Sequence, residues 1–367
     1  MQMKKIVTIV GARPQFIKLA PLAPLLDREF EHIIIHTGQH YDKNMSAIFF
    51  EEMNIRQPDI QLTINGSTHA QQTGGMLMDL EKEFIARHPD MVIVFGDTNS
   101  TLAAALAGAK LNIPICHIEA GLRSFDQNMP EEINRVAVDT ISTILSCPTQ
   151  TAVLNLKREG IAQNVMCHGD IMLDAQLHFL SMIDSTKERH LLETYQVNKE
   201  NYAVCTLHRP SNTDHQNMLS NIIETMGQLE ETIIFPMHPR TKKQIKHYDI
   251  QLPQNVIETD PLGYLDMLTI IKQSKYVLTD SGGLQKDAFF LEKPCITLRD
   301  TTEWVETIHH NCNQLVLETP DSFDASKLLD AVNVSRTASF EYQPFGDGRM
   351  CQAILRDIQQ YFETISQ

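Results

Sequence analysis

Three carboxylates in the first half of the chain have positions that suit proton transfer. Asp97 follows an apolar run at residues 91–95, and Glu119 follows a second run at 113–118. Glu131 comes after a short loop. Carboxylates that lie together and partly buried have pKa values that are pushed apart, which provides an acid and a base. If the three converge they could carry acid/base chemistry, whereas each one alone could equally be a helix cap or a surface charge.

A turn in the second half could bind an anion. The segment Asp280-Ser-Gly-Gly-Leu-Gln-Lys-Asp287 places two glycines between an apolar run and a predicted helix. Helix N-termini have unpaired N–H groups and a partial positive charge, so Ser281, Gly282 and Gly283 suit a phosphate. Asp287, one helical turn further on, could accept a hydrogen bond from a ribose. The same glycines would also serve an ordinary strand-to-helix turn.

Cations follow other apolar runs of the sequence. Gly11-Ala-Arg-Pro-Gln-Phe-Ile-Lys18 opens a predicted helix, and its Arg13 and Lys18 could hold phosphate oxygens. An arginine occupies the second glycine position of a dinucleotide fingerprint, so NAD binding is not expected. His208 and His238 each precede an arginine closely and could neutralise a pyrophosphate, and His208 could titrate near neutral pH.

The histidines do not predict a metal site. His208-Arg-Pro does not place two ligands on one face, so we expect no metal.

The remaining basic candidates lie near the same apolar runs and are Arg123, Arg135, Arg240 and Arg299.

The elements that must position these groups alternate along the chain. Short β-rich runs are followed by polar turns and then by longer amphipathic stretches, in both halves of the sequence. This alternation predicts an α/β fold of two Rossmann-like domains with parallel sheets, in which ligands bind beyond the carboxyl ends of the strands. A more polar stretch at residues 174–200 places the domain boundary near residue 175, and a cleft between the domains is the expected site.

Size and charge exclude several classes of protein. The chain has 367 residues and a formal net charge of −15, with no cluster of Lys and Arg that could neutralise a nucleic acid. Its seven cysteines have no C-x-x-C spacing and are expected to be reduced thiols. The first apolar run is too short for a signal peptide or a membrane span, so we expect a soluble, cytoplasmic protein without a membrane partner.

Six motifs, in order along nearly the whole chain, resemble those of the non-hydrolysing UDP-N-acetylglucosamine 2-epimerase family. They are Gly11-x-Arg-Pro-x-x-Ile-Lys18, Gly96-Asp-Thr, His117-Ile-Glu-Ala-Gly-Leu-Arg123, Pro130-Glu-Glu-Ile-Asn-Arg135, Thr279-Asp-Ser-Gly-Gly283 and Arg299-Asp-Thr-Thr-Glu303. The resemblance implies a GT-B fold in which two Rossmann-like domains face a central cleft. The N-terminal domain would span residues 1–175 and be completed by a C-terminal helix at about 350–367, and residues 176–349 would bind UDP.

The resemblance also implies a reaction. C2 of the sugar carries no acidic proton, so the family eliminates UDP to give a 2-acetamidoglucal and adds it back with the proton on the other face. Asp97, Glu119 and Glu131 would be the acid/base groups, assisted by His208. The UDP-sugar would be held by Arg13, Lys18, Arg123, Arg135, His238, Arg240, Ser281, Gly282, Gly283, Asp287 and Arg299. No cofactor is implied, and the family suggests a homodimer that supplies precursors of surface polysaccharides.

Departures from the family pattern leave the substrate open. The chain has His208-Arg-Pro-Ser where UDP-GlcNAc enzymes commonly have His-Arg-Arg-Glu, so the family's allosteric site is in doubt. Asp287 is one methylene shorter than the usual glutamate. Trp304 and Val305 resemble the branch that epimerises UDP-2,3-diacetamido-2,3-dideoxyglucuronic acid. A hydrolysing epimerase, a GT-B glycosyltransferase and a non-catalytic UDP-sugar binder are the alternatives.

Overall fold

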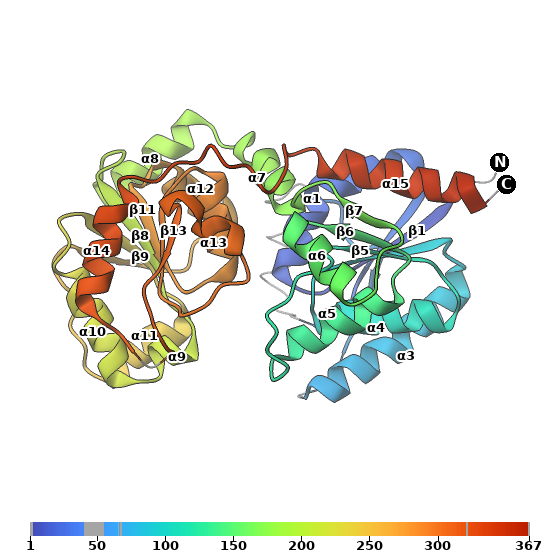
Figure 1. Cartoon of the computed structure of the whole chain (residues 1–367), viewed down its shortest axis with the longest axis horizontal. Coiled ribbons are helices and arrows are strands. Elements are labelled where there is room, and N and C mark those ends of the chain that lie inside the picture. Colours follow the sequence, from blue (N-terminus) through green and yellow to red (C-terminus); the bar gives the residue numbers. More distant parts are fainter. Residues whose placement is uncertain (1–2, 40–54, 65, 67, 321, 366–367) are drawn as a thin grey trace. The chain divides into compact units, whose positions relative to one another are not determined.

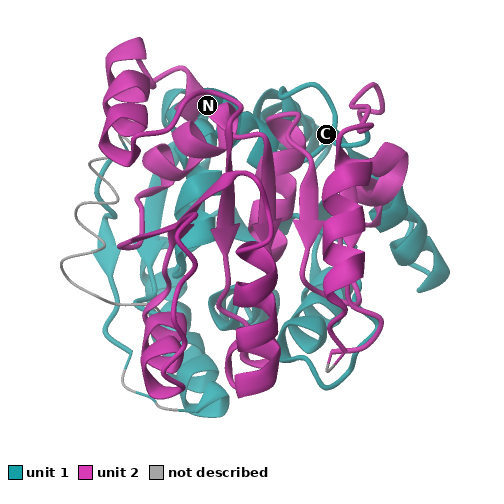
Figure 2. Cartoon of the chain, turned by 90° about the vertical axis from the view of Figure 1, so that its left-hand side faces the viewer, with its two compact units in different colours: residues 1–178, 344–367 teal, residues 179–343 magenta. Residues whose placement is uncertain are grey.

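The computed structural model describes residues 3–39, 55–64, 66, 68–320 and 322–365 (Figure 1). The chain divides into two compact units, which we call unit 1 (residues 1–178 and 344–367) and unit 2 (residues 179–343) (Figure 2). The sequence predicts a boundary near residue 175, and the division lies after residue 178.

Unit 1 is built on a seven-stranded sheet whose strands are all parallel, in the order β3-β2-β1-β4-β5-β6-β7. The strands are β1 (Lys5–Val10), β2 (Glu31–His36), β3 (Ile60–Gln61), β4 (Met91–Phe95), β5 (Ile115–Ile118), β6 (Ile144–Cys147) and β7 (Val165–Cys167). The described helices are α1 (Arg13–Glu29), α3 (His69–Arg87), α4 (Asn99–Lys110), α5 (Pro130–Ile141), α6 (Gln150–Arg158), α7 (Ile171–Leu180), which runs across the division, and α15 (Met350–Ile365).

Unit 2 repeats this architecture with a six-stranded parallel sheet in the order β10-β9-β8-β11-β12-β13. The strands are β8 (Tyr202–Thr206), β9 (Thr232–Pro236), β10 (Val256–Thr259), β11 (Tyr276–Thr279), β12 (Cys295–Thr297) and β13 (Asn313–Leu315). The helices are α8 (Ser185–Tyr195), α9 (Pro210–Thr213), α10 (Gln216–Met226), α11 (Pro239–His247), α12 (Tyr264–Gln273), α13 (Gly282–Phe290), the 3-10 helix η1 (Val305–Asn311) and α14 (Ala325–Ser335).

The central strands form because they are continuously apolar. All five residues of β4 are buried, and so are all four of β11, which is typical of strands covered on both faces by helices. The predicted pair of parallel-sheet α/β domains is therefore confirmed. Within the described part of the chain, no helix combines the length and the apolar composition that crossing a membrane requires.

The strand orders place a topological switch point in each sheet. In unit 1 the order reverses between β1 and β4, and in unit 2 it reverses between β8 and β11. The crevice beyond the carboxyl ends of strands at such a point is the usual ligand site of open α/β sheets. Asp97, His208 and Ser281 lie in the turns that directly follow β4, β8 and β11, and Arg13 begins α1 just after β1.

The C-terminal helix α15 belongs to unit 1 and is attached there by a buried carboxylate. Asp174 of α7 accepts hydrogen bonds from the backbone N–H groups of Met350 (3.1 Å) and Cys351 (2.8 Å), the first two residues of α15. The helix packs along α1, and Phe362 makes an edge contact with Phe30. Asp174 thus acts as a tertiary cap for groups that have no partner within the helix.

We expect Asp174→Ala to lower the free energy of unfolding by about 1–2 kcal/mol, because two buried N–H groups lose their acceptors. Urea denaturation followed by circular dichroism measures this loss. Asp174→Asn keeps one acceptor oxygen and should lose less, while Asp184→Ala removes an exposed cap of α8 as a control. An alanine variant as stable as the wild type would contradict this account of the attachment.

Candidate active site

Asp97 lies in the turn after β4 and is paired with an arginine. The Arg135 guanidinium donates to Asp97 Oδ2 at 2.5 Å and to Glu132 Oε2 at 3.0 Å. Burial raises the pKa of Asp97 above its usual range, and the positive charge of Arg135 opposes this rise. Among the residues that the structure describes, Arg135 Nε is a buried donor without a hydrogen-bond partner.

Glu119 lies in the turn after the neighbouring strand β5 and forms a buried ion pair with Lys18 of α1. A Cβ atom built on Gly96 would lie 3.1 Å from Glu119 Oε2 and 3.3 Å from Lys18 Nζ, so this pair is next to the turn that carries Asp97. Glu119 has a φ of 71°, a left-handed conformation that is uncommon for a glutamate. Two of the three predicted carboxylates are therefore close neighbours in the structure.

Glu131, the third predicted carboxylate, is exposed in the first turn of α5. The next residue, Glu132, is the buried one. Its carboxylate accepts hydrogen bonds from the backbone N–H groups of Ser124 (2.9 Å) and Phe125 (3.0 Å) as well as from Arg135. Glu132 therefore fixes both the loop before α5 and the partner of Asp97, a role that the sequence analysis does not predict.

Arg123 differs from the expectation that it binds substrate. Its side chain is 1% exposed, and its guanidinium is engaged by two carboxylates. One N–H donates to Asp139 Oδ2 at 2.7 Å, and two others donate to Glu159 at 2.7 and 2.6 Å. Because every nitrogen of the guanidinium has a protein acceptor, the structure favours a positioning role for this arginine over a ligand-binding one.

In unit 2, Asp280 connects the two turns at the switch point. Its fully buried carboxylate accepts from the backbone N–H groups of His208 (3.0 Å) and Arg209 (2.9 Å) and from the Asn212 amide (3.1 Å). The ring of His208 also lies 2.9 Å from Asp280 Oδ1. Burial alone would raise the pKa of Asp280, but the bonds and charge of His208 lower it, so the residue is an ionised anchor.

The predicted anion turn begins α13. The Ser281 hydroxyl accepts from the Leu284 N–H at 3.5 Å and thereby caps the helix, as its position predicts. A Cβ atom on Gly282 would face Glu303, Trp304 and the Arg299 guanidinium at 3.6–3.8 Å. Arg299 forms a two-point ion pair with Glu303, with both distances at 3.0 Å.

Three further candidates of unit 2, Asp287, His238 and Arg240, differ in their exposure to solvent and in their partners. Asp287 is buried and accepts from the Tyr264 hydroxyl at 3.1 Å. His238 is largely exposed, and its ring lies 5.9 Å from the ring of His208. Partial removal of the ring from water, and then the positive charge of His208, lower the pKa of His238. Arg240 is exposed and ion-paired with Asp214, so the structure favours a surface role for it.

Two buried polar side chains that hold these turns are not predicted by the sequence analysis. Gln15 accepts from the Gly11 N–H at 2.8 Å and donates to the Phe95 carbonyl at 2.9 Å, which joins the turns after β1 and β4. Asp139 accepts from Arg123 and from the ring of His117. Glu132, Arg135 and Asp139 recur at i, i+3 and i+7, so helical periodicity could have indicated one polar, inward face of α5.

The arrangement can perform two kinds of chemistry. Unit 1 places two carboxylates, each paired with a cation, next to a switch point, and such a pair can act as acid and base. Unit 2 places a capped helix N-terminus beside arginine and histidine side chains, which suits an anion.

Three comparisons relate the chain to known proteins. Residues 25–359 match the family described as UDP-N-acetylglucosamine 2-epimerase. A UDP-N-acetylglucosamine 2-epimerase homolog of Methanococcus maripaludis is 49% identical over 94% of this chain and 96% of its own. The UDP-2,3-diacetamido-2,3-dideoxy-D-glucuronate 2-epimerase of Pseudomonas aeruginosa is 44% identical over 95% of this chain and 98% of its own. The crystal structure of the Methanocaldococcus jannaschii UDP-GlcNAc 2-epimerase with UDP-GlcNAc and UDP has a TM-score of 0.85 at 41% identity, covering 97% of this chain and 99% of that one.

We expect Arg135→Gln to raise the pKa of Asp97, because the substitution removes the positive charge that opposes the effect of burial. A ¹³C NMR titration of the Asp97 carboxylate measures the change. Arg87→Gln removes a half-buried arginine that pairs with Glu83 on α3 and serves as the control. An Asp97 pKa that stays constant or falls in Arg135→Gln would contradict the assigned electrostatics.

Proposed function

Because the chain belongs to the UDP-N-acetylglucosamine 2-epimerase family, we propose that Asp97 and Glu119 transfer the proton that inverts C2 of a UDP-N-acetylaminosugar. The observation that carries this assignment is the placement of both carboxylates beside the unit 1 switch point, around Gly96. Each is joined to a different cation, so their environments differ as an acid and a base require.

The enzyme is a non-hydrolysing 2-epimerase, and its reaction proceeds by elimination and re-addition. A base takes the proton from C2, the C1=C2 double bond forms, and the C1–O bond breaks with its electron pair on the departing UDP. The intermediate is a 2-acetamidoglucal. A proton then adds to the opposite face of C2 while an oxygen of UDP forms the bond to C1 again, so no group is gained or lost.

The two carboxylates suit the two faces of C2. Burial raises the pKa of Asp97, which favours its protonated form, whereas Lys18 pairs with Glu119 and favours its ionised form. We assign Glu119 as the base and Asp97 as the acid for one direction of the reaction, and the reverse for the other direction. Glu131 remains a third candidate, one that faces solvent in this structure.

Unit 2 would hold the UDP that leaves and returns. The N-terminus of α13 offers N–H groups at Gly282 and Gly283, and Arg299 lies beside this turn. Charge that develops on the departing diphosphate would be stabilised there, and such preorganised donors typically contribute several kcal/mol. Asp287, which Tyr264 orients, would accept from the ribose. His208, oriented by Asp280, would assist the departure as a proton donor.

We propose that the sugar is the 2,3-diacetamido-2,3-dideoxyglucuronic acid derivative, with UDP-GlcNAc as the second candidate. The support is the segment Trp304-Val305, which resembles that branch and lies next to the anion turn. The Trp304 ring is buried, and the Lys286 ammonium lies 3.7 Å from its centroid. Trp304 thus lies beside Gly282, with the Lys286 ammonium over its ring. The UDP-GlcNAc branch usually has Arg-Pro in place of Trp304-Val305.

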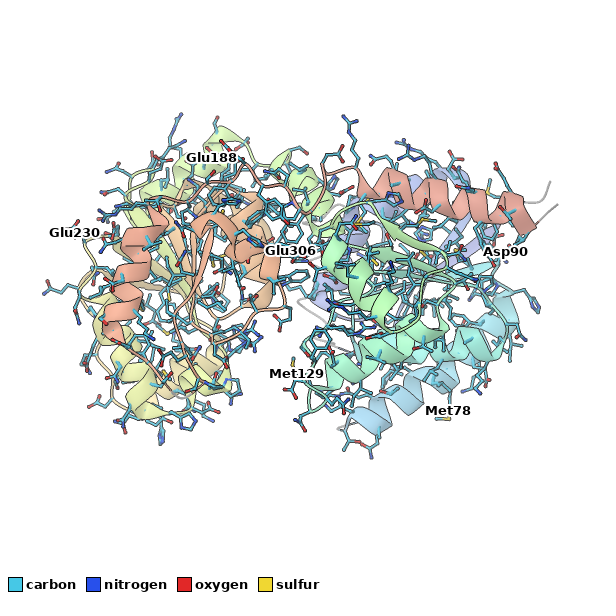
Figure 3. All side chains as sticks on the ribbon, viewed as in Figure 1. Met78, Asp90, Met129, Glu188, Glu230 and Glu306 are labelled. Atoms are coloured by element: carbon cyan, nitrogen blue, oxygen red, sulfur yellow. The ribbon has the colours of Figure 1, made fainter. Side chains whose placement is uncertain are left out.

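We propose that the enzyme works in the cytoplasm as a homodimer. All seven cysteines are free thiols, in keeping with a reducing compartment. Unit 1 exposes apolar side chains on two helices, Met78 and Ile85 on α3 and Ile133 and Val136 on α5. Met78 projects outward from α3 (Figure 3), and exposed apolar side chains of this kind often pack in a symmetric interface.

We expect incubation of the wild-type enzyme with its UDP-sugar in D₂O to give the 2-epimer with deuterium at C2, detected by NMR of the H2 and anomeric signals. Asp97→Asn and Glu119→Gln should each lower kcat by about 10²-fold or more, because a carboxamide cannot exchange a proton. Glu83→Gln removes a carboxylate that pairs with Arg87 on α3 and serves as a control outside the proposed chemistry. An epimer without deuterium, or unchanged turnover in both variants, would exclude these assignments.

We expect the wild type to have a higher kcat/KM for the diacetamido uronic acid substrate than for UDP-GlcNAc. Trp304→Arg should move the ratio of the two kcat/KM values toward UDP-GlcNAc by about tenfold, the scale of one changed contact in a binding pocket. Steady-state kinetics with both substrates measures the ratio. A ratio that Trp304→Arg leaves unchanged would separate this segment from substrate choice.

A further inference from the structure

His117 is a fully buried residue of β5 whose ring contacts two hydrogen-bond acceptors. Nδ1 lies 2.7 Å from Asp139 Oδ1, and Nε2 lies 2.8 Å from the carbonyl oxygen of Gly96. A carbonyl oxygen cannot donate, so Nε2 must carry a hydrogen. The protonation of Nδ1 therefore depends on whether Asp139 is ionised.

Asp139 has the environment of an ionised carboxylate. Its second oxygen, Oδ2, accepts from the Arg123 guanidinium at 2.7 Å and from the Gly121 N–H at 3.1 Å. Burial alone would raise the pKa of Asp139, but the bonds and charges of His117 and Arg123 lower it. An ionised Asp139 can only accept, so both ring nitrogens of His117 must donate.

The groups around this ring balance its charge. Asp139 faces it from α5, Arg123 approaches from the loop after β5, and Glu159, beyond the end of α6, pairs with Arg123. The cysteine of β6, Cys147, has its pKa raised by burial and by Asp139 and is a neutral thiol. Two cations thus alternate with two anions, which compensates their removal from water.

The ring connects the turns that carry both candidate acid/base groups. Gly96, whose carbonyl it holds, has a φ of 60° and directly precedes Asp97. Glu119 follows His117 by two residues on the same strand end, and its backbone is also left-handed. Asp139 holds the Gly121 N–H in the same turn. A single His117–Asp139 pair is therefore bonded to both turns.

We propose that His117 is a positioning residue, protonated on both ring nitrogens, that orients Asp97 and Glu119 for proton transfer by holding the turns in which they lie. The inference rests on the proposed roles of these two carboxylates. The two ring nitrogens of His117 bond Asp139 and the Gly96 carbonyl, so we assign the ring no step in the proton transfer.

The chain offers a matched control in His32. This histidine is also buried and also bonds an aspartate, with Nδ1 2.6 Å from Asp27 Oδ1. Its Nε2 lies 2.9 Å from the hydroxyl oxygen of Thr8, which can donate as well as accept. A neutral ring satisfies both contacts, and burial lowers the pKa of His32. His32 lies near the amino end of β2, whereas the turns of the candidate active site follow the carboxyl ends of their strands.

The protonation is tested by NMR of the wild-type enzyme labelled with ¹³C and ¹⁵N, in which through-bond correlations to the assigned backbone identify the ring nitrogens of His117. We expect both ring nitrogens of His117 to give the signals of protonated nitrogens at neutral pH, and His32 to give those of a neutral ring. A neutral tautomer at His117 would overturn the proposal, and this readout does not require the variant to fold.

The positioning role is tested by kinetics of His117→Gln against His32→Gln. We expect His117→Gln to lower kcat by about 10²-fold, the cost of misplacing a catalytic group by about 1 Å, with little change in KM. His32→Gln should keep its kcat although it loses stability. A kcat loss in His117→Gln no larger than that in His32→Gln would contradict the proposal.

Failure of this inference differs from failure of the proposed function. If Asp97→Asn and Glu119→Gln lose activity while His117→Gln retains it, the carboxylates are correctly assigned and His117 does not position them. If the two carboxylate variants retain activity, the assignment of the acid and the base fails, whatever the protonation of His117.

Discussion

Carboxylates that are removed from water must be paired with donors, and both units are organised around this constraint. Asp139 in unit 1 and Asp280 in unit 2 are fully buried at the carboxyl ends of their sheets. An unpaired charge there would cost several kcal/mol. Asp139 accepts from the Gly121 N–H and the Arg123 side chain, and Asp280 accepts from the backbone N–H groups of His208 and Arg209. The bonds that pair each charge therefore also fix the turns that carry the donors.

The same pairing gives the two proposed acid/base groups different environments. Glu119 and Asp97 lie near each other, yet one is joined to a lysine and the other to an arginine that Glu132 also holds. The burial of Asp97 and the repulsion between the two carboxylates raise the pKa of Asp97. A reversible epimerisation needs such a difference, because each group must accept a proton in one direction and return one in the other.

Helical phase decides what the adjacent glutamates of Pro130-Glu-Glu do. A motif contains both residues, and its residue types suit either one for proton transfer. The phase of α5 turns Glu132 inward with Arg135 and Asp139, while Glu131 stays exposed. The periodic spacing of these three polar residues was available in the sequence, but it became informative only once α5 was known to have a buried polar face.

The sequence by itself determined the alternation of strands and helices, the turns that follow the strands, and the ordered motifs that identify the family. These are local patterns, since an apolar strand, a glycine turn and a helix cap are each specified within a few neighbouring residues. Only the tertiary structure decided which charge pairs with which, and so separated Arg123 from the predicted ligand-binding residues. The partners are distant in the chain: Lys18 and Glu119 are 101 positions apart, and Asp97 and Arg135 are 38 positions apart. Strand order at the switch points brings them together, and a local pattern does not specify that order.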